Sequence, residues 1–287
     1  MKLLNYKEGN QVCLAIKSER GIIPVKGSIS NGNYEMPTTI EQVIASGEDG
    51  LRALEKFEKA ASFTLPEDNL TYAPCVTHPE KILCVGFNYI EHGNECNITL
   101  PTHPILFSKF NNALAAHNQI IHLPKTAEKF DYEAELVVIM GKEAFNVTKE
   151  EALNYVFGYA IGNDLSARDL QFRTQQWLLG KSCDSFAPVG PYIVTADEIN
   201  PNHLEIQCAV NGEVRQSSST SRMIFDCAAI ISYTSQYMTL KPGDIIFTGT
   251  PSGVILGYPQ ENQKWLKSGD QVSVSIENLG TLVNMLK

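Results

Sequence analysis

The stretch Phe130-Asp-Tyr-Glu-Ala-Glu-Leu-Val-Val-Ile-Met-Gly141 decides the fold of this 287-residue chain. Its second half, Leu136 to Met140, is a continuous apolar run closed by a glycine, which is typical of a buried strand. Side chains at i and i+2 of a strand share a face, so Asp131, Glu133 and Glu135 face the same way. Carboxylates gathered on one face repel one another and coexist most easily around a cation. Oxygen ligands select a hard ion such as Mg²⁺ or Mn²⁺.

A third metal-ligand candidate follows a second predicted strand. The run Phe157-Gly-Tyr-Ala-Ile-Gly-Asn163 is apolar and leads into Asp164. Neighbouring strands can bring Asp164 beside Glu133 and Glu135, and three carboxylates leave about half of an octahedral shell open for water and substrate. The spacing alone fits an edge strand with a solvated acidic face equally well. Asp131 is interpreted as a solvated acid at the strand end rather than as a fourth ligand.

Composition bounds the class of protein. Hydrophobic residues make up 43% and charged residues 19% of the chain, which suits one large globular domain, or one domain with a smaller appendage. The net charge of −9 without a basic cluster argues against nucleic acid as a partner. Seven scattered cysteines without Cys-x-x-Cys favour a reducing cytoplasm over a disulfide framework or zinc cluster. No apolar run approaches the roughly 18 residues that a membrane helix needs.

The chain is predicted to divide into a small N-terminal α/β domain, residues 1–76, and a strand-dominated domain, residues 80–287. The fold class is therefore α+β and β-rich. Two hairpins are predicted, at 204–216 with a turn at Asn211-Gly212, and at 271–286. The predicted helices are 39–46, 51–61, 148–156 with a capping box, and 223–238.

Two side chains form a candidate acid–base pair. His92 and Glu95 are spaced i, i+3, which places them side by side on a helical turn. A carboxylate can hold one imidazole nitrogen and leave the other free to activate water. Without further evidence, a surface histidine near a surface glutamate is the more common explanation of such a pair.

Further candidates could hold an anionic ligand. In Asp164-Leu-Ser-Ala-Arg168-Asp169-Leu-Gln171, a helical turn would point Arg168 and Gln171 toward the carboxylates, and arginine grips a carboxylate with two donors. An Arg168 ion pair with Asp164 or Asp169 is the simpler alternative. Lys181 in Gly180-Lys-Ser182 could approach a small anion. Thr250, in Phe247-Thr-Gly-Thr-Pro-Ser-Gly253, lies in a turn that could expose backbone N–H groups, although most such stretches are plain turns.

These segments together resemble the fumarylacetoacetate hydrolase family, in its fumarylpyruvate and acylpyruvate hydrolase branch. The match runs in order from about residue 80 to the end of the chain. It is carried by Gly86-Phe-Asn-Tyr…His92…Glu95, Tyr132-Glu-Ala-Glu-Leu136, Asn163-Asp-Leu-Ser-Ala-Arg-Asp-Leu-Gln171, Gly180-Lys-Ser-Cys-Asp-Ser-Phe-Ala-Pro-Val-Gly-Pro191, Val210-Asn-Gly-Glu213 and Thr248-Gly-Thr-Pro-Ser-Gly-Val254.

The resemblance implies a mixed β-roll with flanking helices, a small variable N-terminal domain and a homodimer. It implies one Mg²⁺ or Mn²⁺ per subunit on Glu133, Glu135 and Asp164. The same resemblance implies roles for six other side chains: a catalytic dyad on a lid segment (His92, Glu95) and contacts to the substrate's oxo-acid end (Arg168, Gln171, Lys181, Thr250). The family's eponymous enzyme has a further aspartate ligand, and Phe87-Asn-Tyr-Ile90 replaces that segment here.

The implied activity is hydrolysis of a C–C bond in acylpyruvate-type or fumarylpyruvate-type 2-oxo acids. His92, oriented by Glu95, would activate the water, and the leaving pyruvate enolate would be held by the metal and Lys181. Decarboxylation of oxaloacetate, or isomerisation and hydration of unsaturated 2-oxo acids, on the same site is the alternative within the family. A ligand-binding member without turnover is the alternative of a different class.

Overall fold

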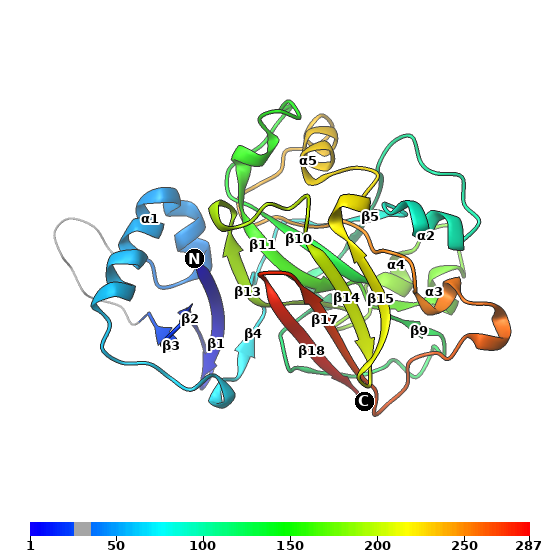
Figure 1. Ribbon diagram of the computed structural model, residues 1–287, viewed down its shortest axis with the longest axis horizontal. Coiled ribbons are helices and arrows are strands. Elements are labelled where there is room, and N and C mark those ends of the chain that lie inside the picture. Colours follow the sequence, from blue (N-terminus) through cyan, green and yellow to red (C-terminus); the bar gives the residue numbers. More distant parts are fainter. Residues whose placement is uncertain (26–35) are drawn as a thin grey trace.

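The computed structural model describes residues 1–25 and 36–287. Within these residues the chain forms an eleven-stranded sheet, a five-stranded sheet and a two-stranded pair, with few helices (Figure 1). This arrangement confirms the predicted α+β, strand-rich class. None of the candidate site residues falls within residues 26–35, which lie outside the described part of the chain.

The centre of the large sheet is buried on both faces. Every residue of β10 (Ala134–Met140), β11 (Val156–Asn163) and β13 (Ala187–Thr195) is buried. Alternate side chains of the run after Glu135 pack into two separate hydrophobic cores: Leu136 belongs to one core and Val137 to the other. A strand covered on both sides needs apolar residues without alternation, which explains the continuous run.

The large sheet has the order β3-β2-β1-β13-β11-β10-β16-β5-β6, with β4 beside β1 and β7 beside β13. Its other strands are β1 (Lys2–Glu8), β2 (Gln11–Ser18), β3 (Gly21–Pro24), β4 (Tyr72–Ala73), β5 (Ile82–Gly86), β6 (Ile105–Lys109), β7 (Leu114–Ala115) and β16 (Ile245–Phe247).

The five-stranded sheet covers one face of the large sheet, and both predicted hairpins are confirmed within it. Asn211 (φ 52°) and Gly212 (φ 81°) supply the positive-φ pair that a type I′ turn requires. The strands are β8 (Ile120–Ile121), β14 (Glu205–Val210), β15 (Glu213–Ser219), β17 (Gln271–Ile276) and β18 (Gly280–Leu286). The separate pair consists of β9 (Phe130–Asp131) and β12 (Ser166–Ala167).

The helices differ from the prediction in two places. The two predicted N-terminal helices agree with the two helical segments of α1 (Ile40–Ala60), which are separated by a kink at the non-helical Gly47. The helix predicted at 148–156 is wrong: only the 3₁₀ turn Ala152–Tyr155 forms before β11 starts at Val156, and Thr148 Oγ1 donates to the Glu151 carboxylate. The helix predicted at 223–238 is shorter, α5 (Cys227–Ser235). The remaining helices are α2 (Ile90–Glu95), α3 (Arg168–Gln171) and α4 (Leu178–Lys181).

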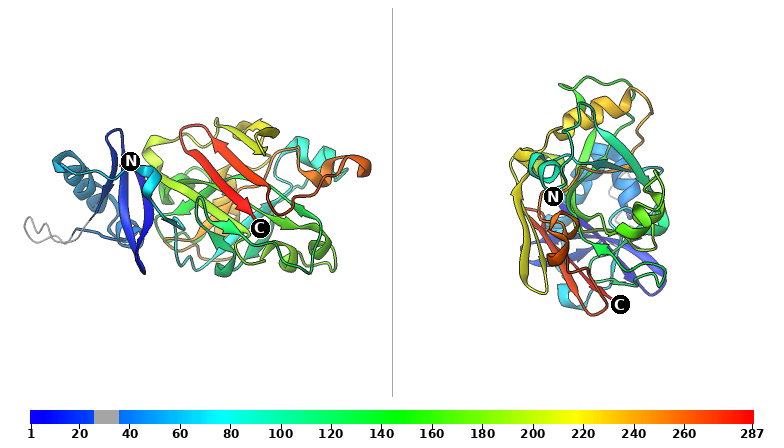
Figure 2. Two further views of the ribbon diagram at one scale, coloured as in Figure 1. Left: turned by 90° about the horizontal axis from the view of Figure 1, so that it is seen from below. Right: turned by 90° about the vertical axis from the view of Figure 1, so that its right-hand side faces the viewer.

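The N-terminal segment and the short helices lie at opposite ends of the molecule. Strands β1–β3 and α1 occupy one end of the long axis, and α2, α3 and α4 occupy the other (Figures 1 and 2). Strand β1 pairs with β13, Lys2 opposite Val194, so the large sheet runs through both parts. A domain division at residues 76–80 remains a proposal. No helix among the described residues is long and apolar enough to cross a membrane.

The close packing around Gly162 yields a first prediction. A Cβ at Gly162 would lie 2.5 Å from Val137 Cγ2 and 2.5 Å from Phe247 Cε1. Gly162→Ala is therefore expected to lower the free energy of unfolding by about 1–3 kcal/mol, as overpacking usually does. Denaturant unfolding measures the loss, and the same change in a Val137→Ala background should cost less. An equal cost in both backgrounds would exclude the contact with Val137 as the cause.

Candidate metal and acid–base site

Strand register brings the three predicted metal ligands together. In the antiparallel β10–β11 pair, Glu135 lies opposite Gly162 and Ala134 opposite Asn163. The backbone then places Asp164 across from Glu133, and Asp164 N donates to Glu133 O at 2.9 Å. Opposed residues share a face of a sheet, so all three carboxylates converge. One oxygen from each lies within 4.8 Å of the others, and all three side chains are buried.

Cations already hold two of these carboxylates. Lys181 Nζ lies 2.5 Å from Glu133 Oε2 and 2.9 Å from Asp164 Oδ2. The second oxygen of Asp164 lies 2.5 Å from Lys109 Nζ, and the second oxygen of Glu133 lies 2.7 Å from Arg168 Nη2. Burial alone would raise the pKa of the Glu133 carboxyl, but Lys181, Arg168 and His92 outweigh it and hold that pKa well below its ordinary value.

Glu135 has no such partner. Its Oε2 accepts a hydrogen bond from Gly249 N at 2.6 Å, and no lysine or arginine of residues 1–25 and 36–287 forms an ion pair with it. Burial first, and then the charges of Asp164 and Glu133, raise the pKa of the Glu135 carboxyl well above its ordinary value. The site therefore lacks one positive charge beside Glu135.

A hard divalent ion fits this donor set. Oxygen ligands around an octahedral ion with bonds of about 2.1 Å lie about 3.0 to 4.2 Å apart, within the spread of the three carboxylates. The ion would supply the charge that Glu135 lacks. Three protein oxygens on one side leave the other positions open toward the pocket. The residues thus suit Mg²⁺ or Mn²⁺ and offer no nitrogen or sulfur on this face.

Arg168 and Asp131 depart from the expectations drawn from the sequence. Asp131 is not a solvated acid: it is fully buried and accepts hydrogen bonds from Ile255 N (2.8 Å), Leu256 N (3.0 Å) and Arg168 Nε (2.9 Å). Arg168 pairs with Asp131 and Glu133 rather than with Asp164 or Asp169. Its guanidinium mainly orients Glu133, and each terminal nitrogen keeps one N–H for a ligand.

The residues predicted to bind an anion line the same pocket. In Gln171 and Thr250 the acceptor oxygen is already bonded to another protein group, which leaves the N–H or O–H group free to donate to a ligand. Gln171 Oε1 accepts from Arg168 Nη1 at 2.9 Å, which leaves the Gln171 amide N–H groups for a ligand. Thr250 Oγ1 accepts from Gln216 Nε2 at 2.8 Å, so its own O–H is free to donate. With the third N–H of Lys181, the pocket offers donors that suit an oxo-acid anion.

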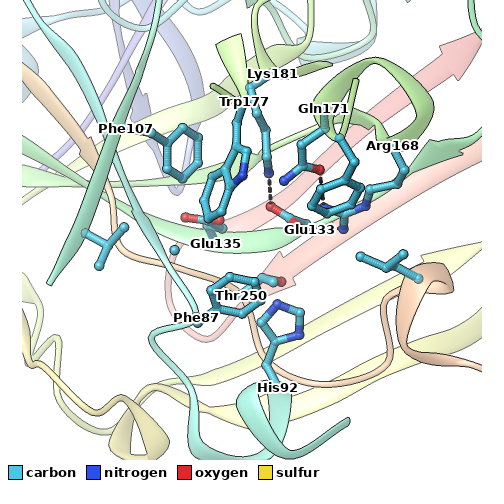
Figure 3. Close-up of a pocket in the computed structure, with 14 residues that line it drawn as sticks. Phe87, His92, Phe107, Glu133, Glu135, Arg168, Gln171, Trp177, Lys181 and Thr250 are labelled. Carbon is cyan, nitrogen blue, oxygen red and sulfur yellow. Dashed lines mark hydrogen bonds and ion pairs between the residues drawn. The ribbon is translucent and has the colours of Figure 1, made fainter. Parts of the chain in front are cut away.

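His92 and Glu95 form the predicted pair. His92 Nδ1 lies 2.8 Å from Glu95 Oε1, and Gly253 N donates to the other Glu95 oxygen at 2.9 Å. The His92 ring is buried and lines the pocket. Figure 3 shows His92 on one side of Glu133 and Glu135, and Lys181 on the other. Since Glu95 occupies Nδ1, the remaining nitrogen, Nε2, can exchange a proton with a ligand.

Aromatic side chains close the rest of the pocket. Phe87 stacks on His92 with ring centroids 5.4 Å apart, and Trp177 meets Phe87 and Phe107 edge-on at 5.8 and 5.3 Å. Phe87 adopts φ 52°, which is uncommon for a bulky residue and directs the ring at the dyad. This wall is apolar, and the cations among the described lining residues, Arg168 and Lys181, lie at the carboxylate end.

Sequence reasoning missed three buried polar residues that build the site. Lys109 follows an apolar strand and bonds Leu165 O and Phe186 O besides Asp164. Gln216 accepts from Ala134 N, between the two glutamates, at 3.0 Å. Asn88 bonds Thr248 O, Phe225 O and Phe225 N. Of these three residues, only Lys109 could have been noticed in the sequence, as a lone lysine at the end of an apolar strand. The partners of Gln216 and Asn88 are distant in sequence, so no local pattern pointed to them.

Comparison with known proteins places the chain among enzymes. Residues 81–287 match the family model described as Fumarylacetoacetate (FAA) hydrolase C-terminal. The rat (Rattus norvegicus) protein named oxaloacetate tautomerase Fahd2a, mitochondrial, is 41% identical over 251 residues, which cover 87% of this chain and 80% of the relative. The fold and these matches define a strand-rich class of enzymes that includes hydrolases, isomerases and tautomerases.

Solved structures agree with this class. The 5-carboxymethyl-2-hydroxymuconate delta-isomerase from Mycobacterium smegmatis superposes with a TM-score of 0.77 at 30% identity, covering 100% of this chain and 99% of that one. Fumarylpyruvate hydrolase from Pseudomonas aeruginosa, in complex with Mn²⁺ and pyruvate, gives 0.66 at 31% identity over 79% of this chain and 92% of that one. The chain belongs to the fumarylacetoacetate hydrolase family. Its acylpyruvate branch stays a prediction.

The unpaired charge of Glu135 yields a prediction about metal binding. In the metal-free protein, the raised pKa of Glu135 means that a proton must leave before an ion binds. Mn²⁺ affinity is therefore expected to rise with pH, by at most about tenfold per pH unit. Calorimetric titration at several pH values measures it. Glu135→Gln should weaken binding by about a hundredfold, roughly 2.7 kcal/mol, and lose most of the pH dependence.

Glu95→Gln is the matched control for this titration, because Glu95 bonds His92 and Gly253 N and is not one of the three carboxylates Glu133, Glu135 and Asp164. Its Mn²⁺ affinity should stay within about threefold of the wild type, or 0.7 kcal/mol. Wild-type affinity in Glu135→Gln would remove Glu135 from the ligand set.

Proposed function

We propose that this protein is a divalent-metal-dependent enzyme that interconverts the enol and keto forms of a small 2-oxo acid, with oxaloacetate as the first substrate to test. One observation carries the proposal: the Glu95-oriented imidazole of His92 lines the same pocket as Glu133 and Glu135, two of the three converging carboxylates. The name of the 41%-identical rat relative, an oxaloacetate tautomerase, supports this choice over the C–C hydrolase expected from the sequence.

The chemistry needs an anion held at one end and a proton moved at the other. Gln171, Thr250, Lys181 and the open N–H groups of Arg168 would bind the carboxylate and oxo oxygens. A bound Mg²⁺ or Mn²⁺ would supply Lewis acidity that stabilises the negative charge of the enolate. His92 Nε2 would deliver a proton to C3 of the enol form, while the enol O–H proton is lost to solvent. Glu95 would stabilise the charge that His92 carries between cycles.

Hydrolysis of an acylpyruvate is the second candidate, because the same imidazole could activate water instead. The Mn²⁺- and pyruvate-bound fumarylpyruvate hydrolase, 31% identical, supports it. The largely aromatic wall of Phe87, Phe107 and Trp177 favours the tautomerase, since among these three side chains only the Trp177 indole N–H could hold a hydrolytic water. A homodimer and a cytoplasmic location remain proposals, and the rat relative is named as mitochondrial.

The test measures decay of enol-oxaloacetate and cleavage of acetylpyruvate under Mg²⁺. The wild type should accelerate the first reaction far more than the second. His92→Gln should lower kcat by about 10²- to 10⁴-fold, as expected for loss of a general acid–base group, with Mn²⁺ affinity kept. Glu91→Gln, at the residue before His92 on α2 and paired with Arg222, is the control and should keep full activity. Faster cleavage of acetylpyruvate would reverse the choice between the two candidates.

A further inference from the structure

A second, chemically different cluster of donors lies on the helix that carries the dyad. His92, Glu95 and Cys96 are spaced i, i+3 and i+4 around the end of α2, so they share one side of the helix. Glu95 Oε1 lies 2.8 Å from His92 Nδ1, and Cys96 Sγ lies 3.9 Å from the same nitrogen. One donor atom from each residue lies within 4.8 Å of the others.

The donor set is that of a soft or borderline cation. Thiolate, imidazole and carboxylate are the ligands of Zn²⁺ and its analogue Cd²⁺, whereas Glu133, Glu135 and Asp164 offer oxygen alone. Donors around a tetrahedral Zn²⁺ lie about 3.3 to 3.6 Å apart, for bonds of about 2.0 to 2.3 Å. The nitrogen–oxygen pair would open by about 0.5 Å and the nitrogen–sulfur pair would close by about 0.3 Å relative to that range. Both changes are within side-chain motion.

Cys96 is accessible enough to bind an ion from solvent. It is half-buried, whereas four of the seven cysteines, Cys75, Cys84, Cys208 and Cys227, are fully buried. Burial first, and then the neighbouring Glu95, raise the pKa of the Cys96 thiol to about 12, so it is a poor nucleophile without a metal. Among the described residues, no other cysteine lies in a cluster of three potential metal ligands.

We infer that His92 Nδ1, Glu95 and Cys96 Sγ form a second metal site, selective for Zn²⁺-like ions, whose occupation switches the catalytic dyad off. Binding releases the thiol proton to solvent and takes the lone pair of Nδ1. The imidazole proton then resides on Nε2, the nitrogen that faces the ligand. An imidazole metallated at Nδ1 keeps its last proton on Nε2, and losing that proton to C3 would leave an imidazolate, so His92 no longer serves as the proton donor and turnover stops while the carboxylate site keeps its own ion.

Only the loss of turnover rests on the proposed function; metal binding does not. The probe is Cd²⁺, added to enzyme saturated with Mg²⁺. Cd²⁺–thiolate absorption in the ultraviolet is expected to saturate at about one equivalent. Cys96→Ser and Cys96→Ala should lose this band, and His92→Gln should weaken the binding. Cys13→Ser and Cys183→Ser, at the other two half-exposed cysteines, are the controls and should keep the band.

The parallel activity measurement uses the same Cys96 and control variants. Cd²⁺ should inhibit the wild type at a concentration at least about tenfold lower than it inhibits Cys96→Ser, with Mg²⁺ retained. A band that persists in Cys96→Ser, or disappears in Cys183→Ser, overturns the site. Equal inhibition of wild type and Cys96→Ser with release of Mg²⁺ also overturns it, because the ion would then act at Glu133, Glu135 and Asp164. If the enzyme shows no turnover, the absorption titration still decides the metal site.

Discussion

The structure depends on a charge imbalance that the fold keeps away from water. Four buried carboxylates face three buried cations, and the described ion pairs leave Glu135 without a positive partner. Separating a charge from water is costly unless it is paired, so this arrangement is stable only with a proton or a cation beside Glu135. The seven groups are Asp131, Glu133, Glu135, Asp164, Lys109, Arg168 and Lys181. The opposite pKa shifts of Glu133 and Glu135 express the same imbalance.

The sheet can hold this imbalance because its centre is rigid. Strands β10 and β11 are buried along their whole length, and two separate cores press on the two faces of β10. Repulsion between carboxylates would push apart strands at an exposed edge, but here β13 and β16 flank the pair on both sides. Gln216 adds a link from the second sheet, since it joins Ala134 N to Thr250. Packing thereby fixes the positions of ligands that electrostatics alone would scatter.

The sequence predicts local features well and long-range partners poorly. The apolar run after Glu135 was sufficient to predict the strand, and the Asn211-Gly212 pair was sufficient to predict the hairpin. Both signals are local, because hydrophobic patterning and turn preferences depend on neighbouring residues. The convergence of Asp164 with the glutamates could be predicted, because all three residues lie near the ends of neighbouring strands. The partners of Arg168 could not be predicted, because Asp131 lies 37 positions away and is itself held by the backbone N–H groups of residues 255 and 256. The helix expected at 148–156 did not form although Thr148 and Glu151 bond to each other, because this contact joins two side chains and a cap must bond a backbone N–H.

The sheet carries the carboxylates and α2 carries the His92–Glu95 pair, and this separation offers an explanation of how one fold supports several reactions. The carboxylate end is built on the buried strands β10 and β11 and is held by ion pairs, so it can change little. The acid–base end rests on a six-residue helix, attached through Glu95 to Gly253 N and through Asn88 to Phe225. Tautomerisation, isomerisation and hydrolysis of 2-oxo acids share an enolate and differ in where a proton or water enters. Under the proposed function, His92 and the Phe87 ring stacked on it would set that point of entry in this chain, so changes in α2 and Phe87 would alter the reaction while the metal ligands stay the same.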